Sequence, residues 1–262
     1  MKNDCLNIAA AGETNAGLLR RVNEDCFLIC RPCGGKKLLA VVSDGIGGHS
    51  DGEIASKICC RDMMDAAMGD LRENDDPQEF LLRTLESINS KLFERNYREE
   101  RLHPMGCTVV AALFDAERIV IANIGDSRFY QFVPGEVPEL QQITRDHRPE
   151  EKVLDGLALR YRVSKEILRS RVLQRALGTR HDIQADFYFS GVLPGASYLL
   201  CSDGLHGRTP DVAISRCLNT PERSVRERTS ALVREALLYG GRDNVTVITV
   251  QYVNGENNNA AS

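Results

Sequence analysis

The stretch Leu38-Leu39-Ala40-Val41-Val42-Ser43-Asp44-Gly45-Ile46-Gly47-Gly48 decides how this chain folds. Its first five residues form a continuous apolar run, typical of a strand buried on both faces, and an acid and glycines follow. Four other acidic motifs also follow strand-like segments: Asn23-Glu24-Asp25, Gly125-Asp126-Ser127-Arg128, Ser202-Asp203-Gly204 and Gly241-Arg242-Asp243-Asn244. The preference of aspartate for turns explains one such motif, but five with the same order predict that the fold gathers them into one cluster.

A cluster of ionised carboxylates needs a counterion. Like charges in one cleft repel each other unless a cation neutralises them or some of them become protonated. Ligand sets made only of oxygen favour Mg²⁺ or Mn²⁺ over zinc or copper, since hard cations prefer carboxylate, carbonyl and water. The sequence therefore predicts a divalent metal site of this kind.

Composition excludes several classes of protein. The chain has 262 residues, of which 42% are hydrophobic, and 33 basic against 37 acidic residues give a net charge of -4. This balance argues against nucleic acid as a partner. No apolar stretch of signal-peptide length follows the first residues, and no run approaches the roughly 20 apolar residues of a membrane span. We expect a soluble, cytoplasmic monomer with no membrane partner.

Nine cysteines are present, and we expect them to be reduced because the count is odd and the chain is long. Cys30 and Cys33 form a Cys-x-x-Cys pair with Cys26 upstream, which is a pattern seen in zinc and redox sites. No second pair has matching spacing, so the pattern favours core cysteines over a structural zinc site.

Apolar periodicity predicts a mixed order of strands and helices. We expect strands at 6–11, 26–30, 38–42, 108–114, 119–124, 128–132, 183–189, 197–201 and 245–250, and helices at about 51–67, 78–101 and 222–238. Ser50 is available to cap the first helix. The three strands between 108 and 132 suggest an antiparallel meander with turns at Asp115-Ala116-Glu117 and Gly125-Asp126.

This pattern predicts an α+β fold, a four-layer αββα sandwich in which two stacked antiparallel sheets are flanked by helix pairs. We expect one domain over residues 1–253. Residues from about 145 to 182 are charged and weakly periodic, which predicts an exposed, mobile, helical insert. Its arginines, Arg148 among them, could meet acidic or phosphorylated surfaces or pair with nearby glutamates. Residues 254–262 predict a disordered tail.

With these motifs in hand, the chain resembles the metal-dependent serine/threonine protein phosphatases of the protein phosphatase 2C family, in their bacterial form. The resemblance spans Thr14 to Val250. It follows the family's motif order through Gly17–Asp25, Val42–His49, Gly52–Ser56, Met105–Thr108, Asn123–Arg128, Ile143–His147, Arg175–Gly178, Leu200–Leu205 and Arg242–Thr246. It implies the same αββα sandwich, with two Mn²⁺ or Mg²⁺ ions between the sheets and room for a third.

The resemblance also implies a role for each site residue. Asp44 would bridge both ions with help from the carbonyl of Gly45, and Asp203 and Asp243 would complete the first site. The remaining roles are as follows: Glu24 and Asp25 for the second ion, Asp126 with Asp203 for a third and weaker ion, and Arg20 for the substrate phosphate.

The implied reaction is hydrolysis of phosphoserine and phosphothreonine in phosphoproteins, by a hydroxide that bridges two metal ions. Arg20 and Asp44 would be the catalytic residues, and a cognate serine/threonine kinase would act in opposition. Two alternatives stay open: a non-catalytic module that binds phosphoproteins on the same fold, and a metal-dependent hydrolase of a non-protein phosphoester.

The chain departs from the family pattern in two places. Ile46 stands where animal-type members carry a histidine, so the leaving alkoxide must take its proton from metal-bound water or from the substrate phosphate. His49 is better explained as an anchor of the loop than as a substitute acid. Cys107 stands where relatives usually carry threonine or serine. The insert corresponds to the family's flap, where we expect substrate choice to reside.

Overall fold

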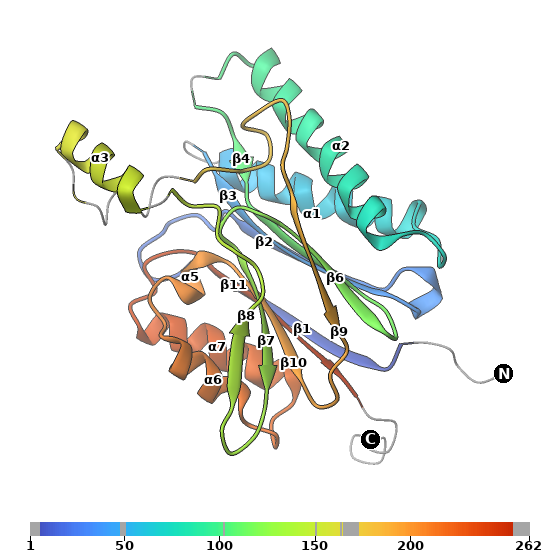
Figure 1. Cartoon of the computed structure of the whole chain (residues 1–262). Helices are drawn as coiled ribbons and strands as arrows, with labels where there is room; N and C mark the ends of the chain where they lie inside the picture. The colour runs from blue at the N-terminus through green and yellow to red at the C-terminus, as the bar shows by residue number, and fades with distance from the viewer. Residues whose placement is uncertain are drawn as a thin grey trace.

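The computed structural model describes residues 6–47, 51–101, 103–149, 151–162, 164 and 173–253. They form two stacked antiparallel sheets with helices on both outer faces (Figure 1), which confirms the predicted αββα sandwich. Ser50, His49 and the tail 254–262 lie outside the described residues, so their roles stay predictions. Among the described residues, no helix has the length and apolar character needed to cross a membrane.

Each sheet combines strands from the first and the second half of the chain. Sheet 1 has the order β1 (Ile8–Asn15), β11 (Val245–Tyr252), β10 (Ser197–Cys201), β7 (Arg128–Val133) and β8 (Glu139–Gln142). Sheet 2 has the order β2 (Asp25–Cys30), β3 (Leu38–Ile46), β5 (Val109–Phe114), β6 (Arg118–Ile124) and β9 (Asp186–Gly191), and the short β4 (Gly106–Cys107) pairs with the end of β3.

Helices cover the outer face of each sheet, as Figure 1 shows. The long helices α1 (Asp51–Gly69) and α2 (Pro77–Arg98) lie on sheet 2, and α6 (Asp211–Leu218) and α7 (Val225–Leu238) lie on sheet 1. Three shorter elements complete the fold: the 3-10 turn η1 (Cys33–Gly35), α3 (Glu151–Tyr161) in the flap segment, and α5 (Asp203–His206) directly after β10.

The continuous apolar run of β3 is explained by burial of both of its faces. Leu39 and Val41 pack into the cluster beneath α1 and α2, whereas Leu38, Ala40 and Val42 pack between the two sheets. Because successive side chains of a strand alternate between faces, a strand in this position needs apolar residues at every step. The run that predicted a buried strand therefore also places β3 in the centre of the molecule.

The predicted meander over 108–132 is wrong in its last strand. β5 and β6 pair with each other in sheet 2, but β7 crosses to sheet 1, where it pairs with β10 and β8. The Gly125-Asp126 turn is thus a connection between sheets rather than a hairpin. Hydrophobic alternation cannot distinguish the two cases, because the inner faces of both sheets bury side chains in the same layer.

The sheets are not successive halves of the sequence, since β1 joins sheet 1 and β9 joins sheet 2. One further expectation needs correction. The flap segment is also less exposed than its charge suggested, because His147, Leu154 and Leu177 are buried. The strand β8 and the helix α6 were not predicted, because each is too short to show a clear apolar periodicity.

An aromatic cluster joins the two sheets. The ring of Phe114 on β5 lies 6.3 Å from Phe129, 5.8 Å from Tyr198 and 6.4 Å from Tyr252, all three of which belong to sheet 1. Phe114 is fully buried. Aromatic pairs at such separations add to the free energy gained from burial alone.

Phe114→Ala should therefore lower the free energy of unfolding by about 3 to 5 kcal/mol, because it leaves a cavity between the sheets. Urea denaturation followed by circular dichroism measures this loss. The matched control is Phe189→Ala on β9, whose side chain is exposed and whose removal should change stability by less than about 0.5 kcal/mol. Equal losses in the two variants would show that the inter-sheet cluster does not hold the sheets together.

Candidate metal centre

The acidic residues of sheet 2 meet at the ends of two neighbouring strands. Asp25, the first residue of β2, lies directly across from Asp44 near the end of β3. The backbone N–H of Asp44 donates to Thr108 Oγ1 at 3.1 Å, and Thr108 Oγ1 in turn lies 2.7 Å from Ser127 Oγ. A buried chain of hydroxyl groups therefore holds this edge of the sheet in place.

Sheet 1 contributes its own acids to the same place. Ser202 Oγ, directly after β10, donates to Asp25 Oδ2 at 2.7 Å and accepts from the N–H of Thr246 at 3.0 Å. Asp203 follows as the first residue of α5. Its neighbour Gly204 has no room for a Cβ atom, which would collide with the carbonyl oxygen of Asn244. The structure thus brings the ends of β2, β3 and β10 together.

Asn244 holds the loop that carries Glu24 and Arg20. Its side-chain oxygen accepts from the N–H of Glu24 at 2.9 Å, and its amide donates to the carbonyls of Ala16 and Val22, each at 2.9 Å. Sequence reasoning placed Asn244 in a motif but assigned it no task. Its position immediately before β11 allows one side chain to fix three backbone groups of a distant loop.

Arg20 points toward the acidic cluster. Its guanidinium pairs with Asp243 Oδ2 at 2.8 Å, and its side chain is 51% exposed. The second oxygen of Asp243 accepts from the N–H of Asn244 at 2.9 Å. An exposed arginine beside buried acids can bind an anion from solvent through its planar fork.

Asp126 reaches the cluster from the connection between β6 and β7. His147 Nδ1 accepts from the N–H of Gly125 at 3.0 Å, while the N–H of His147 donates to the carbonyl of Gly125 at 2.9 Å. His206 Nε2 lies 2.9 Å from the carbonyl oxygen of Asp126. These contacts fix the turn on which the buried Asp126 side chain sits.

Arg148 is the cation that sequence reasoning misplaced. Its Nε donates to Asp126 Oδ2 at 2.7 Å, and its NH2 group lies 3.2 Å from Asp203 Oδ2. The charge of this segment predicts exposure, with its arginines at acidic or phosphorylated surfaces or paired with glutamates, whereas the Arg148 side chain is only 27% exposed and contacts two aspartates of the cluster. No periodicity signals an inward arginine, because the direction of its side chain depends on where the buried acids lie.

The clustered acids have raised pKa values, because they are withdrawn from solvent and the nearby arginines do not fully offset their negative charge. Burial raises the pKa of Asp25 to about 6. Burial also raises the pKa of Asp203 to about 7, with the charges of Asp126 and Asp243 acting in the same direction. The pKa of Asp44 lies well above its usual value, first through burial and then through the charges of Asp25 and Asp203. The cluster therefore resists full ionisation.

The donor set suits a hard divalent cation. Glu24 Oε1 and Asp25 Oδ1 are buried oxygens without a hydrogen-bond partner, and the neighbouring acids offer carboxylate oxygens alone. In the described part of the chain, no three acidic, histidine or cysteine side chains are already arranged to hold a metal ion. Asp126, Asp203 and Asp243 are instead paired with arginines, so cation binding requires them to exchange partners.

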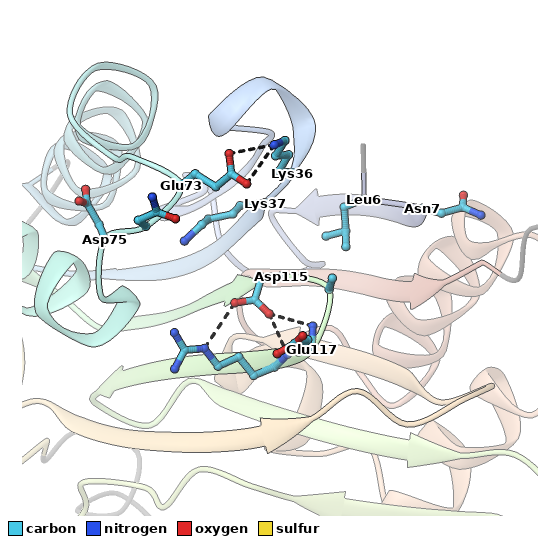
Figure 2. A pocket seen from close by; sticks show the side chains of 11 residues that line it. Leu6, Asn7, Lys36, Lys37, Glu73, Asp75, Asp115 and Glu117 are labelled. Carbon is cyan, nitrogen blue, oxygen red and sulfur yellow. Dashed lines mark hydrogen bonds and ion pairs between the residues drawn. The ribbon is translucent and has the colours of Figure 1, made fainter. Parts of the chain in front are cut away.

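A cavity of about 870 Å³ lies at the other end of the sheets (Figure 2). Lys36 and Lys37, which precede β3, line it together with the β5–β6 turn. Asp44 lies seven residue steps along the extended strand from Lys37, which corresponds to about 23 Å. Its lining includes none of the predicted site residues, so this cavity is separate from the acidic cluster.

Comparison with known proteins places this architecture in a family. The family model described as Protein phosphatase 2C matches residues 20–150. The serine/threonine phosphatase stp of Listeria monocytogenes is 31% identical over 244 residues, which cover 91% of this chain and 93% of that protein. The serine/threonine protein phosphatase PstP of Mycobacterium tuberculosis is 34% identical over 247 residues, covering 93% of this chain and 45% of that protein.

Solved structures agree with the sequence comparisons. The crystal structure of the catalytic domain of PstP, in complex with two manganese ions, superposes with a TM-score of 0.76 at 32% identity. The match covers 94% of this chain and 99% of that one. Together with the relatives that match over nearly their full length, this similarity shows that the chain belongs to the protein phosphatase 2C family.

Proposed function

We propose that this chain is a metal-dependent phosphatase that hydrolyses phosphoserine and phosphothreonine in phosphorylated proteins. The observation that carries the proposal is the cluster of Asp25, Asp44 and Asp203, drawn from both sheets, in which the buried Asp25 keeps one oxygen without a hydrogen-bond partner. Family membership and the names of the relatives support the reaction class. The manganese ions in the PstP structure support dependence on metal.

The acidic residues divide naturally between two cations. Asp44, which the other acids surround, would be shared by both, and the carbonyl of Gly45 would assist it. The remaining ligands would be Asp203 and Asp243 for one ion, Glu24 and Asp25 for the other, and Asp126 for a third. Bound to these residues, divalent cations would supply an activated water molecule as the nucleophile and would offset negative charge on the phosphoryl group.

Arg20 would bind the phosphoryl group of the substrate. Its exposed guanidinium already lies beside the acidic cluster, and it is held there by Asp243. A planar fork can donate to two phosphoryl oxygens at once, which orients the phosphorus toward the cluster and offsets negative charge in the transition state. Lysine would provide the charge but not the two parallel hydrogen bonds.

The leaving alkoxide needs a proton, and the two histidines beside the site, His147 and His206, are poor donors. His147 is engaged with Gly125 through Nδ1 and with Asp186 through Nε2. Burial lowers the pKa of His206 to about 3, so its imidazole is neutral. With Ile46 apolar, we infer that the proton comes from water or from the substrate phosphate, as the sequence suggested.

The proposal predicts activity that depends on added metal. The purified chain should release phosphate from a phosphothreonine peptide and from p-nitrophenyl phosphate in the presence of Mn²⁺, and EDTA should abolish both reactions. A malachite green assay measures the phosphate released. Turnover of p-nitrophenyl phosphate alone would favour a non-protein phosphoester as substrate. Inertness toward both substrates would favour a binding module.

Asp44→Asn should abolish turnover yet stabilise the metal-free protein. The raised pKa of Asp44 means that the folded state opposes its ionisation, so stability present below the unfolded pKa is lost as the pH rises toward the folded pKa. In EDTA, the variant should gain about 1 kcal/mol or more over wild type at pH 8, and less at pH 5. Thermal unfolding measures the gain.

The control for this variant is Asp182→Asn, at an exposed position remote from the cluster. It should keep both activity and stability. Mn²⁺ should raise the melting temperature of wild type more than that of Asp44→Asn, because binding to the folded state alone stabilises it. Wild-type turnover by Asp44→Asn would contradict the metal assignment.

Arg20→Ala should raise KM and lower kcat/KM by about 10- to 100-fold, the range expected for losing hydrogen bonds to a charged group. Its Mn²⁺ affinity should not weaken, because Arg20 pairs with Asp243 rather than holding metal. Steady-state kinetics and calorimetric Mn²⁺ titration separate the two effects. Arg21→Ala, at the exposed neighbouring arginine, is the control. An unchanged KM in Arg20→Ala would rule out phosphate binding by this residue.

A further inference from the structure

The side chain of Arg148 lies between two acids from different elements. Its guanidinium contacts Asp126, on the β6–β7 connection, through Nε at 2.7 Å and through NH2. The same NH2 group lies 3.2 Å from Asp203 Oδ2 at the start of α5. The Asp126 side chain is 4% exposed and that of Arg148 is 27% exposed, so the contact is largely withdrawn from solvent.

The backbone before Arg148 is held against the site. Asp146 receives two hydrogen bonds from Arg128, each of 2.8 Å. The adjacent His147 exchanges two hydrogen bonds with Gly125 and accepts at its carbonyl from the N–H of Gln174 at 2.9 Å. Because both preceding residues are anchored, Arg148 lies beside the acids near the start of the flap segment, and its inward direction follows from this placement.

Electrostatics explain why an arginine is stable there. Burial raises the pKa of Asp126, and the charge of Arg148 opposes that rise. The carboxylates of the buried Asp126 and the partly exposed Asp203 both contact one guanidinium, which offsets their charge with several donors in a fixed plane. A guanidinium and a metal ion cannot bind the same carboxylate oxygens at once.

We propose that Arg148 is a built-in cation that occupies the place between Asp126 and Asp203 and competes with a divalent ion for these two carboxylates. The inference rests on the proposed function, in which Asp126 and Asp203 could bind a third ion. It implies that an ion held by both Asp126 and Asp203 binds only when Arg148 withdraws, whereas the other two ions would keep ligands other than this pair, such as Asp44 and Asp25. The start of the flap is then coupled to the number of ions bound. Arg148 is thus a positioning residue rather than a catalytic one.

Mn²⁺ binding to the metal-free full chain tests this competition without using activity. Calorimetric titration gives the affinities, and the electron paramagnetic resonance signal of free Mn²⁺ gives the number of ions bound. Arg148→Gln should lower the dissociation constant of the weakest Mn²⁺ site by about tenfold or more, because the competing cation is gone. Arg148→Lys should give a smaller change, since one ammonium keeps the charge but cannot bridge both acids as a fork.

Arg145→Gln is the matched control. It removes the same charge from an exposed position three residues earlier in the chain and should leave every Mn²⁺ site unchanged. In the double variant Arg148→Gln with Asp126→Asn, the gain in affinity should disappear, because one of the two contested carboxylates is lost. Far-ultraviolet circular dichroism checks that each variant is folded, and Arg148→Lys provides the test if Arg148→Gln is not.

The outcomes separate this inference from the proposed function. If wild type binds two Mn²⁺ ions and neither Arg148 variant alters the weakest site, the competition is refuted and the phosphatase proposal stands. An equal gain in Arg145→Gln would also refute it, because the effect would then be one of net charge. If no form of the chain binds Mn²⁺, both proposals fall.

Discussion

The hydrogen bond from Ser202 to Asp25 is the contact on which the acidic site depends, because it joins the two sheets at the edge where their acids meet. Ser202 is itself held by the N–H of Thr246, so the bond aligns β2 of one sheet with β10 and β11 of the other. A buried pair of this kind is strengthened by the low local dielectric. The same low dielectric raises the pKa of Asp25 and Asp44, so the alignment creates a site that favours cations.

Two arginines offset this negative charge, and their environments suit them to different tasks. The pair of Arg20 with Asp243 is exposed, and exposed ion pairs contribute only about 0 to 1 kcal/mol. The binding that we propose, of a phosphate by Arg20 or of a metal ion by Asp243, would therefore break this pair at little cost. Arg148 is bound to the buried Asp126, and breaking a buried pair costs about 3 to 5 kcal/mol unless another cation takes its place. The ion pair of Arg20 with Asp243 is thus easily broken, whereas the pair of Arg148 with Asp126 persists until another cation replaces the guanidinium.

The layered core explains which structural predictions succeeded. The period-two pattern of β3 and β5 sends alternate apolar residues to the helices and to the inter-sheet layer, so the existence of both strands was evident from their sequence. The partner of β7 was not evident. Phe129 on β7 packs between the sheets just as Phe114 on β5 does, so burial alone could not say which sheet β7 joins. The sheet that β7 joins is decided only by the direction of the chain at Gly125 and Asp126, where His147 holds the connection between the sheets.

The sequence by itself determined most of the strands, the long helices and the αββα class, and it singled out the acidic residues, because these depend on local periodicity and on motifs of a few residues. The tertiary structure alone decided how the acids are paired, how far burial raises their pKa, and that Arg148 turns inward to Asp126 and Asp203. The physical reason is that the electrostatic potential and the burial at each acidic side chain depend on many residues that are remote along the chain. No local sequence pattern reveals the total charge or burial at such a point. Both are set when the register of the sheets brings the remote residues together.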